Sequence, residues 1–87
     1  RSLDDLNSIR GASWEEAEKL IPSDWLKGPL NKGEGVKYIN PHKRGEQILL
    51  ERGNPMSRDP LHQGPYIKVS RNGEIVRIPL EGNPTLQ

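Results

Sequence analysis

Glycine and proline interrupt the chain so often from residue 28 onward that long helices are disfavoured there. Gly28-Pro29, the stretch 32–35 and Asn40-Pro41 separate short runs that are rich in β-branched and aromatic residues. Proline lacks the backbone N–H that a helix uses, whereas glycine tolerates the positive φ angles of tight turns. The second half is therefore predicted to form short β-strands joined by turns.

Four strands are predicted, at residues 36–40, 46–51, 66–70 and 74–79. Asn72-Gly73 predicts a tight hairpin between the last two, because both residues tolerate the positive φ angles of its turn. Side chains of residues 66–70 alternate between polar and apolar, which predicts one apolar face and one polar, basic face. The same alternation places Arg77 on the face that carries Ile75.

The first third of the chain predicts helix instead. The sequence from Ser13 to Glu16 has the spacing of a capping box, in which the two side chains satisfy free backbone N–H groups. This helix should end before Pro22, because a residue that precedes proline avoids the helical region. Residues 3–9 have weaker helical character, with apolar side chains spaced for one face.

The order of these segments predicts one α+β domain over residues 1–87, with a helical part at about 3–30 and a sheet at about 34–80. The chain has no cysteine, which excludes disulfides, thiolate catalysis and cysteine-bound zinc. No apolar run approaches the roughly 20 residues of a membrane helix, so stable membrane association is not expected. The chain begins without Met, which favours a fragment of a longer protein.

Metal and nucleotide chemistry find little support in the motifs. The two histidines, His42 and His62, are far apart in the sequence, and no His-Glu-x-x-His or EF-hand pattern is present. The glycine-rich stretch 32–35 does not supply a phosphate-binding Walker A loop. We therefore expect no metal and no other cofactor.

Positive charge is concentrated in residues 31–77. This segment has nine Lys and Arg residues against five Asp and Glu residues, a net charge of +4, whereas residues 1–30 have four against six. Such a block favours a phosphate-bearing ligand through long-range attraction and counterion release. A solvated, charged surface without a ligand is the alternative interpretation.

RNA cleavage without a metal needs a base for the 2′-hydroxyl, an acid for the leaving 5′-oxygen, and cations for the phosphate charge. His42 is a candidate acid or base, and its neighbours Lys43 and Arg44 are candidate phosphate ligands. His62 lies in the long loop 53–65 beside Arg58 and is the second candidate.

Further candidates come from the predicted strands and the long loop. Lys68 would project from a rigid strand as a catalytic or phosphate-binding cation, although an exposed cross-strand lysine is an equal alternative. Ser57 and Arg58 would donate to the scissile phosphate, and Tyr66 would either stack on a base or pack in the hairpin. Lys37 and Asn54 complete the candidate substrate-binding set.

Several motifs between residues 33 and 73 resemble the C-terminal toxin domains of bacterial polymorphic toxins. The motifs are 33–38, Asn40-Pro41, Gly-Asn-Pro-x-Ser at 53–57, Pro-Tyr-Ile-Lys at 65–68 and Asn72-Gly73. Such domains end long Rhs, LXG or CdiA-type carriers. Many are ribonucleases of the barnase/EndoU/colicin/RelE superfamily, in which N-terminal helices pack on a twisted antiparallel sheet, here expected to have about four strands.

The resemblance implies an antibacterial endoribonuclease that cuts RNA, often tRNA, by transesterification to a 2′,3′-cyclic phosphate. It implies delivery from a bacterial cell as the end of a larger toxin, action in the target-cell cytoplasm, and a cognate immunity protein. On the basic face that protein should be acidic, and a host activating factor is a further possible partner. The alternatives are a toxin of another class, a DNase or an NAD-consuming enzyme, and a non-catalytic RNA- or protein-binding module.

Overall fold

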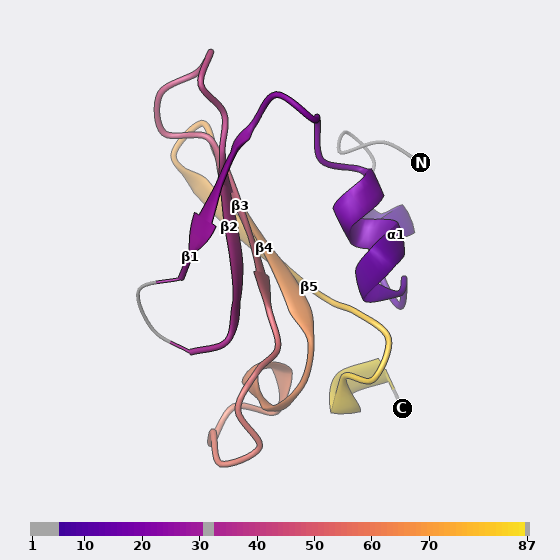
Figure 1. Ribbon diagram of the computed structural model, residues 1–87. Helices are drawn as coiled ribbons and strands as arrows, with labels where there is room; N and C mark the ends of the chain where they lie inside the picture. Colours follow the sequence, from indigo (N-terminus) through magenta and orange to yellow (C-terminus); the bar gives the residue numbers. More distant parts are fainter. Residues whose placement is uncertain (1–5, 31–32, 87) are drawn as a thin grey trace.

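The computed structural model describes residues 6–30 and 33–86 (Figure 1). Its strands are β1 (Leu26–Pro29), β2 (Gly35–Ile39), β3 (Gln47–Glu51), β4 (Tyr66–Arg71) and β5 (Glu74–Pro79). Its helices are α1 (Trp14–Lys19) and the 3-10 turns η1 (Leu6–Ile9), η2 (Pro60–Gln63) and η3 (Pro84–Leu86). The strands form one antiparallel sheet in sequence order, each hydrogen-bonded to the next.

The expectation of an α+β domain with several helices packed on about four strands is wrong. The fold is a five-stranded antiparallel sheet with little helix, because α1 has only six residues and the other helical segments are single 3-10 turns. The additional strand, β1, lies inside the segment that was expected to be helical. Pro29 interrupts helices but fits here, because a strand at the edge of a sheet tolerates a residue without an N–H.

The local signals around α1 and the last hairpin are confirmed. The Ser13 hydroxyl accepts from the Glu16 N–H at 3.1 Å, and the Glu16 carboxylate accepts from the Ser13 N–H at 3.4 Å. Asn72 and Gly73 have φ angles of 52° and 79°, and the strands on either side pair as expected. Residues 6–9 of the weaker helical segment 3–9 form η1, a 3-10 turn, and residues 1–5 lie outside the described residues.

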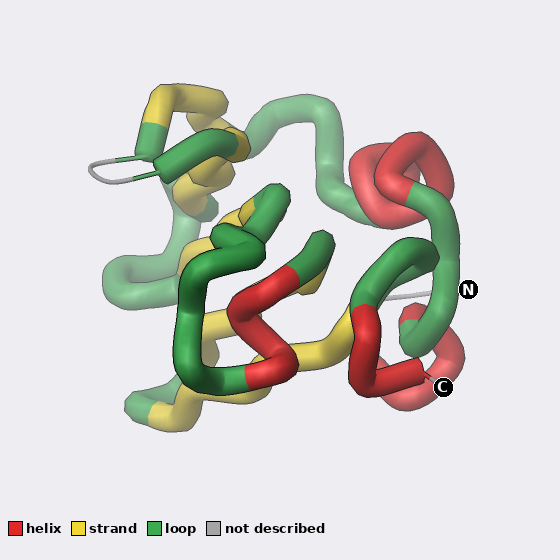
Figure 2. The backbone as a smooth tube through the Cα atoms, turned by 90° about the horizontal axis from the view of Figure 1, so that it is seen from below, coloured by secondary structure: helices red, strands yellow, loops and turns green. Residues whose placement is uncertain are grey.

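The core lies on one face of the sheet only. The N-terminal segment contributes Ile9, Ala12, Ala17, Ile21 and Trp25, and the sheet and the turn after it contribute Tyr38, Ile48, Leu50, Ile67, Val69, Ile78 and Leu80. Seen from below, the helices near the two ends of the chain gather on one side of the strands (Figure 2). The side chains on the other face of the strands, such as those of Lys37, Lys68 and Arg77, do not belong to this core, and we call this side the open face.

The two ends of the sheet carry different connections. The β2–β3 turn and the Asn72-Gly73 hairpin lie at one end, whereas the β1–β2 connection and the fourteen residues 52–65 lie at the other. The segment before α1 also reaches this second end, since the Gly11 N–H donates to the Pro79 carbonyl at 2.9 Å. The long connection is thus held at the end of the sheet where β3 stops and β4 begins.

The capping box makes a stability prediction. Replacing Ser13 by Ala removes the acceptor for the Glu16 N–H and should lower the free energy of unfolding by about 1 kcal/mol. For a domain of this size the melting temperature should fall by about 4–8 °C. Thermal unfolding followed by circular dichroism measures the change, with exposed Ser23→Ala as the matched control. Equal melting temperatures for the two variants would contradict the contribution of the cap.

Candidate functional site

The open face has a row of cations that crosses four strands. The register places Lys37, Leu49, Lys68 and Arg77 directly opposite one another on β2, β3, β4 and β5. We call this set the central row. Lys68 and Arg77 are adjacent like charges, an arrangement that destabilises a sheet. Within residues 6–30 and 33–86, no carboxylate lies within 4.0 Å of any of its cationic groups. The row is therefore suited to an anionic ligand.

Two residues along the strands from the central row, toward the long connection, Glu51 and Tyr66 lie opposite each other on β3 and β4. Tyr66 is only 4% exposed. Burial raises the pKa of the Tyr66 hydroxyl above its ordinary value, and the hydrogen bond and negative charge of Glu51 raise it further. The phenol therefore stays protonated and donates toward the carboxylate, which orients Glu51 on the open face.

The neck of the connection 52–65 is closed by two glycines. Gly53 has a φ of 82°, and a Cβ there would lie 2.4 Å from the Gly64 carbonyl oxygen, so the two backbones approach this closely because residue 53 lacks a Cβ. A Cβ on Gly64 would instead crowd Asn83 and Pro84 at 3.0 Å. The Asn54 N–H donates to the His62 carbonyl at 2.7 Å across the neck. The Asn83 side chain then ties the Leu61 carbonyl to the C-terminal segment at 2.8 Å. These contacts fix the connection against the end of β4.

His62 is held between Asp59 and Tyr66. Its Nδ1 lies 2.8 Å from Asp59 Oδ2, and the other oxygen of Asp59 caps η2 by accepting from the Leu61 N–H at 3.0 Å. The His62 ring meets the Tyr66 ring edge to face, with centroids 5.1 Å apart. No hydrogen bond to the described residues engages Nε2, and one third of the side chain is exposed. Nε2 is therefore the atom that a ligand can reach.

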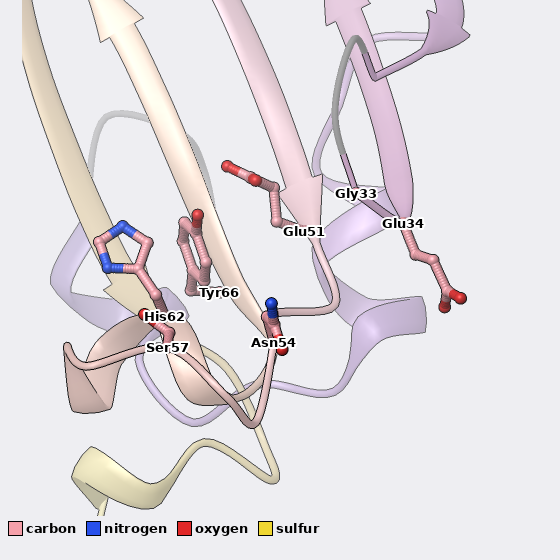
Figure 3. A pocket seen from close by; sticks show the side chains of 8 residues that line it. Gly33, Glu34, Glu51, Asn54, Ser57, His62 and Tyr66 are labelled. Carbon is pink, nitrogen blue, oxygen red and sulfur yellow. The ribbon is translucent and has the colours of Figure 1, made fainter.

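A cleft of about 310 Å³ opens between the connections at this end of the sheet. Its lining consists of Gly33, Glu34, Glu51, Gly53, Asn54, Ser57, His62 and Tyr66. In Figure 3 the Tyr66 ring lies between His62 and Glu51, and the Glu34 carboxylate points away from all three. The cleft thus presents a carboxylate and an imidazole on either side of a tyrosine.

The structure divides the predicted site residues between the two ends of the sheet. At the cleft end it brings together His62, Tyr66, Asn54 and Ser57 in the lining, with Arg58 in the same loop. Lys68 and Lys37 lie in the central row, two residues along the strands from that end. The Asn54 side chain accepts from the Met56 N–H at 2.9 Å and so shapes the loop. Tyr66 is buried, and its ring packs against the ring of His62. This agrees better with the interpretation that Tyr66 is a packing residue than with the interpretation that it stacks on a base.

His42, Lys43 and Arg44 lie in the β2–β3 turn at the opposite end of the sheet. His42 Nε2 lies 2.7 Å from Asp24 Oδ2, and both side chains are mostly exposed. Lys43 Nζ lies 3.7 Å from a carboxylate oxygen of Glu46. These three residues therefore form a group that is separate from the cleft.

Sequence reasoning missed Glu51, Arg77 and Asp59 as site residues. The two-residue turn at Asn72-Gly73 would have placed Arg77 opposite Lys68, because such a turn fixes the register of its hairpin. Asp59 precedes Pro60, a combination typical of a helix N-cap, but nothing local indicates its contact with His62. Glu51 becomes a neighbour of Tyr66 only through the pairing of β3 with β4 across a long connection.

Metal-ligand geometry and membrane-spanning helices are also absent from the described parts of the chain. No three His, Cys, Asp or Glu side chains gather there in a way that would hold a metal ion. None of the helices that the structure describes is long and apolar enough to cross a membrane. Comparison of the chain with protein-family models, with curated proteins and with solved structures gives no match.

The burial of Tyr66 predicts alkaline instability. A tyrosine in the unfolded chain loses its proton near pH 10, whereas folded Tyr66 keeps its proton to higher pH. The unfolded state therefore binds fewer protons, and the free energy of unfolding should fall as the pH rises above about 10. Urea unfolding between about pH 8 and pH 11 measures this slope, which Tyr66→Phe should reduce. An unchanged slope in Tyr66→Phe would contradict the assignment, whatever the absolute stability of the variant.

The contact with Asp59 predicts the tautomer of His62. The carboxylate accepts from Nδ1, so neutral His62 should hold its proton on Nδ1 and leave Nε2 unprotonated. Nitrogen-15 NMR of the imidazole distinguishes the two tautomers. The shorter side chain in Asp59→Ser keeps an oxygen that can cap η2 but does not reach His62 Nδ1. In this variant the tautomer with the proton on Nδ1 should therefore no longer be the major one. Finding the proton on Nε2 in the unaltered protein would rule out this arrangement.

Proposed function

We propose that this domain is a metal-independent endoribonuclease whose acid–base groups lie in the cleft. The observation that supports it is the juxtaposition of Glu51, Tyr66 and His62, one row away from Lys68 and Arg77. A carboxylate, an imidazole and two cations are sufficient for phosphodiester transesterification at a 2′-hydroxyl. They lie on rigid strands or on a connection that is tied to one, which holds such groups in fixed positions.

In the proposed reaction the Glu51 carboxylate accepts the proton of the 2′-hydroxyl, and the 2′-oxygen forms a bond to phosphorus. The bond from phosphorus to the 5′-oxygen breaks, and His62 Nε2 of the imidazolium donates a proton to that oxygen. The products are a 2′,3′-cyclic phosphate and a free 5′-hydroxyl. Asp59 holds the His62 ring in place through Nδ1, and the Tyr66 hydroxyl orients Glu51.

The cations contribute at the phosphate. Negative charge builds up on the non-bridging oxygens as the 2′-oxygen attacks, and fixed positive groups stabilise it most when they are already in place. Lys68 lies two residues from Tyr66 on β4, and Arg77 lies diagonally across from Tyr66 on β5. Lys37 lies diagonally across from Glu51 on β2, on the other side of Leu49. Arg58, Ser57 and Asn54 belong to the loop that borders the cleft and complete the proposed contacts with RNA.

We also propose a biological setting for the domain. The sequence resemblance supports a toxin domain at the end of a larger bacterial carrier, acting on RNA, tRNA in particular, in the cytoplasm of a target cell. The cations of the central row, beside the cleft, form a surface that an acidic immunity protein would cover. The same row supports a second candidate function, a module that binds RNA without cutting it.

RNA cleavage in EDTA tests the proposal. Purified protein should convert bacterial tRNA into discrete fragments that end in cyclic phosphate, visible on a denaturing gel. Glu51→Gln and His62→Ala should each slow cleavage by about 100- to 10,000-fold, the usual contribution of a general acid or base. Glu81→Gln, which changes an exposed carboxylate after β5, is the matched control and should cleave at the original rate.

The variant His42→Ala tests which of the two histidines takes part in cleavage. We expect the loss of cleavage to follow His62, because His42 lies at the other end of the sheet. A loss that follows His42 instead would move the acid–base site to the β2–β3 turn. RNA that binds and stays intact with every preparation would favour the non-catalytic module, and cleavage that EDTA abolishes would favour a metal-dependent nuclease.

A further inference from the structure

Exposed aliphatic side chains form a second row on the open face, parallel to the central row. The register aligns Leu26, Ile39, Gln47, Ser70 and Ile75 across β1 to β5. The three aliphatic members, Leu26, Ile39 and Ile75, are 60%, 38% and 54% exposed. We call this set the apolar row. It lies two residues along the strands from the central row, a distance of about 7 Å.

The apolar row is a feature that the fold does not need. The core covers the opposite face of the sheet. Leu26 and Ile39 are adjacent at one edge of the open face, and Ile75 lies at the other edge beyond Gln47 and Ser70. Large exposed aliphatic side chains on an uncovered surface commonly mark a binding site. It also contributes nothing to the acid–base chemistry, because the central row lies between it and the Glu51–Tyr66 pair. Any ligand that covers it must therefore lie beside the three cations of the central row.

We infer that the two rows together bind a single-stranded nucleic acid that runs across the strands, with phosphates on the central row and unpaired bases on the apolar row. This inference rests on the proposed function and specifies its substrate class. Charge complementarity selects a polyanion, and the adjacent aliphatic row selects one that has apolar faces to bury. Paired bases are stacked inside a duplex, so only an unpaired strand can use both rows at once.

The dimensions of the sheet fit this arrangement. From β2 to β5 the central row spans about 14 Å, enough for a few consecutive phosphates of an extended strand. A phosphate that lies on Lys68 and Arg77 has its base directed toward the apolar row and its other side toward Glu51 and His62. The acid–base groups are then left free of the bases.

Binding of an oligonucleotide that the enzyme cannot cut tests the inference separately from catalysis. A short fluorescent 2′-O-methyl RNA lacks the attacking hydroxyl, and fluorescence anisotropy measures its affinity as a single strand and as a duplex. Single strands should bind more tightly than the duplex. Because three cations contact a single strand, log K against log salt should have a slope of about −2, and Arg77→Ala should reduce its magnitude by about 0.7.

The chain offers a matched pair of variants for the apolar row. Ile75 and Val76 are adjacent on β5, both exposed, and on opposite faces of the sheet. Ile75→Ser should weaken single-strand binding by about fivefold, from lost apolar burial, and leave duplex binding unchanged. Val76→Ser should leave both unchanged. Leu26→Ser provides an independent variant on the other edge strand, and circular dichroism confirms that each variant is folded.

The outcomes separate the inference from the proposed function. Equal affinity for single strand and duplex, or equal effects of Ile75→Ser and Val76→Ser, would overturn the inference even if RNA is cleaved. Single-strand binding that depends on Ile75, with natural RNA left intact, would uphold the inference and overturn the ribonuclease. Tight binding of polyglutamate together with no binding of the single-stranded oligonucleotide would overturn the inference in favour of an acidic protein.

Discussion

The pairing of β4 with a strand on each side is the interaction on which both the core and the cleft depend. Ile67 and Val69 reach the core from one face of β4, while Tyr66 and Lys68 face the other way. Because side chains alternate along a strand, a shift of one residue in this pairing would exchange the two sets. It would bury a lysine and expose two aliphatic side chains. The apolar contacts that stabilise the fold therefore also hold the site residues in register.

Local signals in the sequence were reliable wherever a few neighbouring residues determine the structure. The capping box at Ser13 and the Asn72-Gly73 turn involve only groups within a few residues of one another, so their chemistry can be recognised directly. The polar and apolar faces of residues 66–70 follow from alternation alone. These signals were enough to predict most of the sheet and the orientation of Lys68.

What escaped prediction depends on contacts between distant segments. β1 forms because β2 offers a free edge, and residues 26–29 carry no strand signal of their own beside the Gly28-Pro29 break. The cleft needs the long connection to close at Gly53 and Gly64, and the position of His62 follows from that closure. The contact between the His42 and Asp24 side chains likewise joins segments eighteen residues apart. No periodicity or composition encodes such contacts.

The edges of the sheet have a consequence for how the protein behaves among copies of itself. A small sheet with two free edges is prone to growth by strand addition, which leads to aggregation. Here one edge strand, β1, ends at Pro29, which cannot donate a backbone hydrogen bond. At the other edge, the segment before α1 occupies the end of β5 through bonds from Gly11 to Pro79 and from Glu81 to Ala12. The fold thus discourages self-association at both of its edges and keeps the open face as an extended surface for recognition.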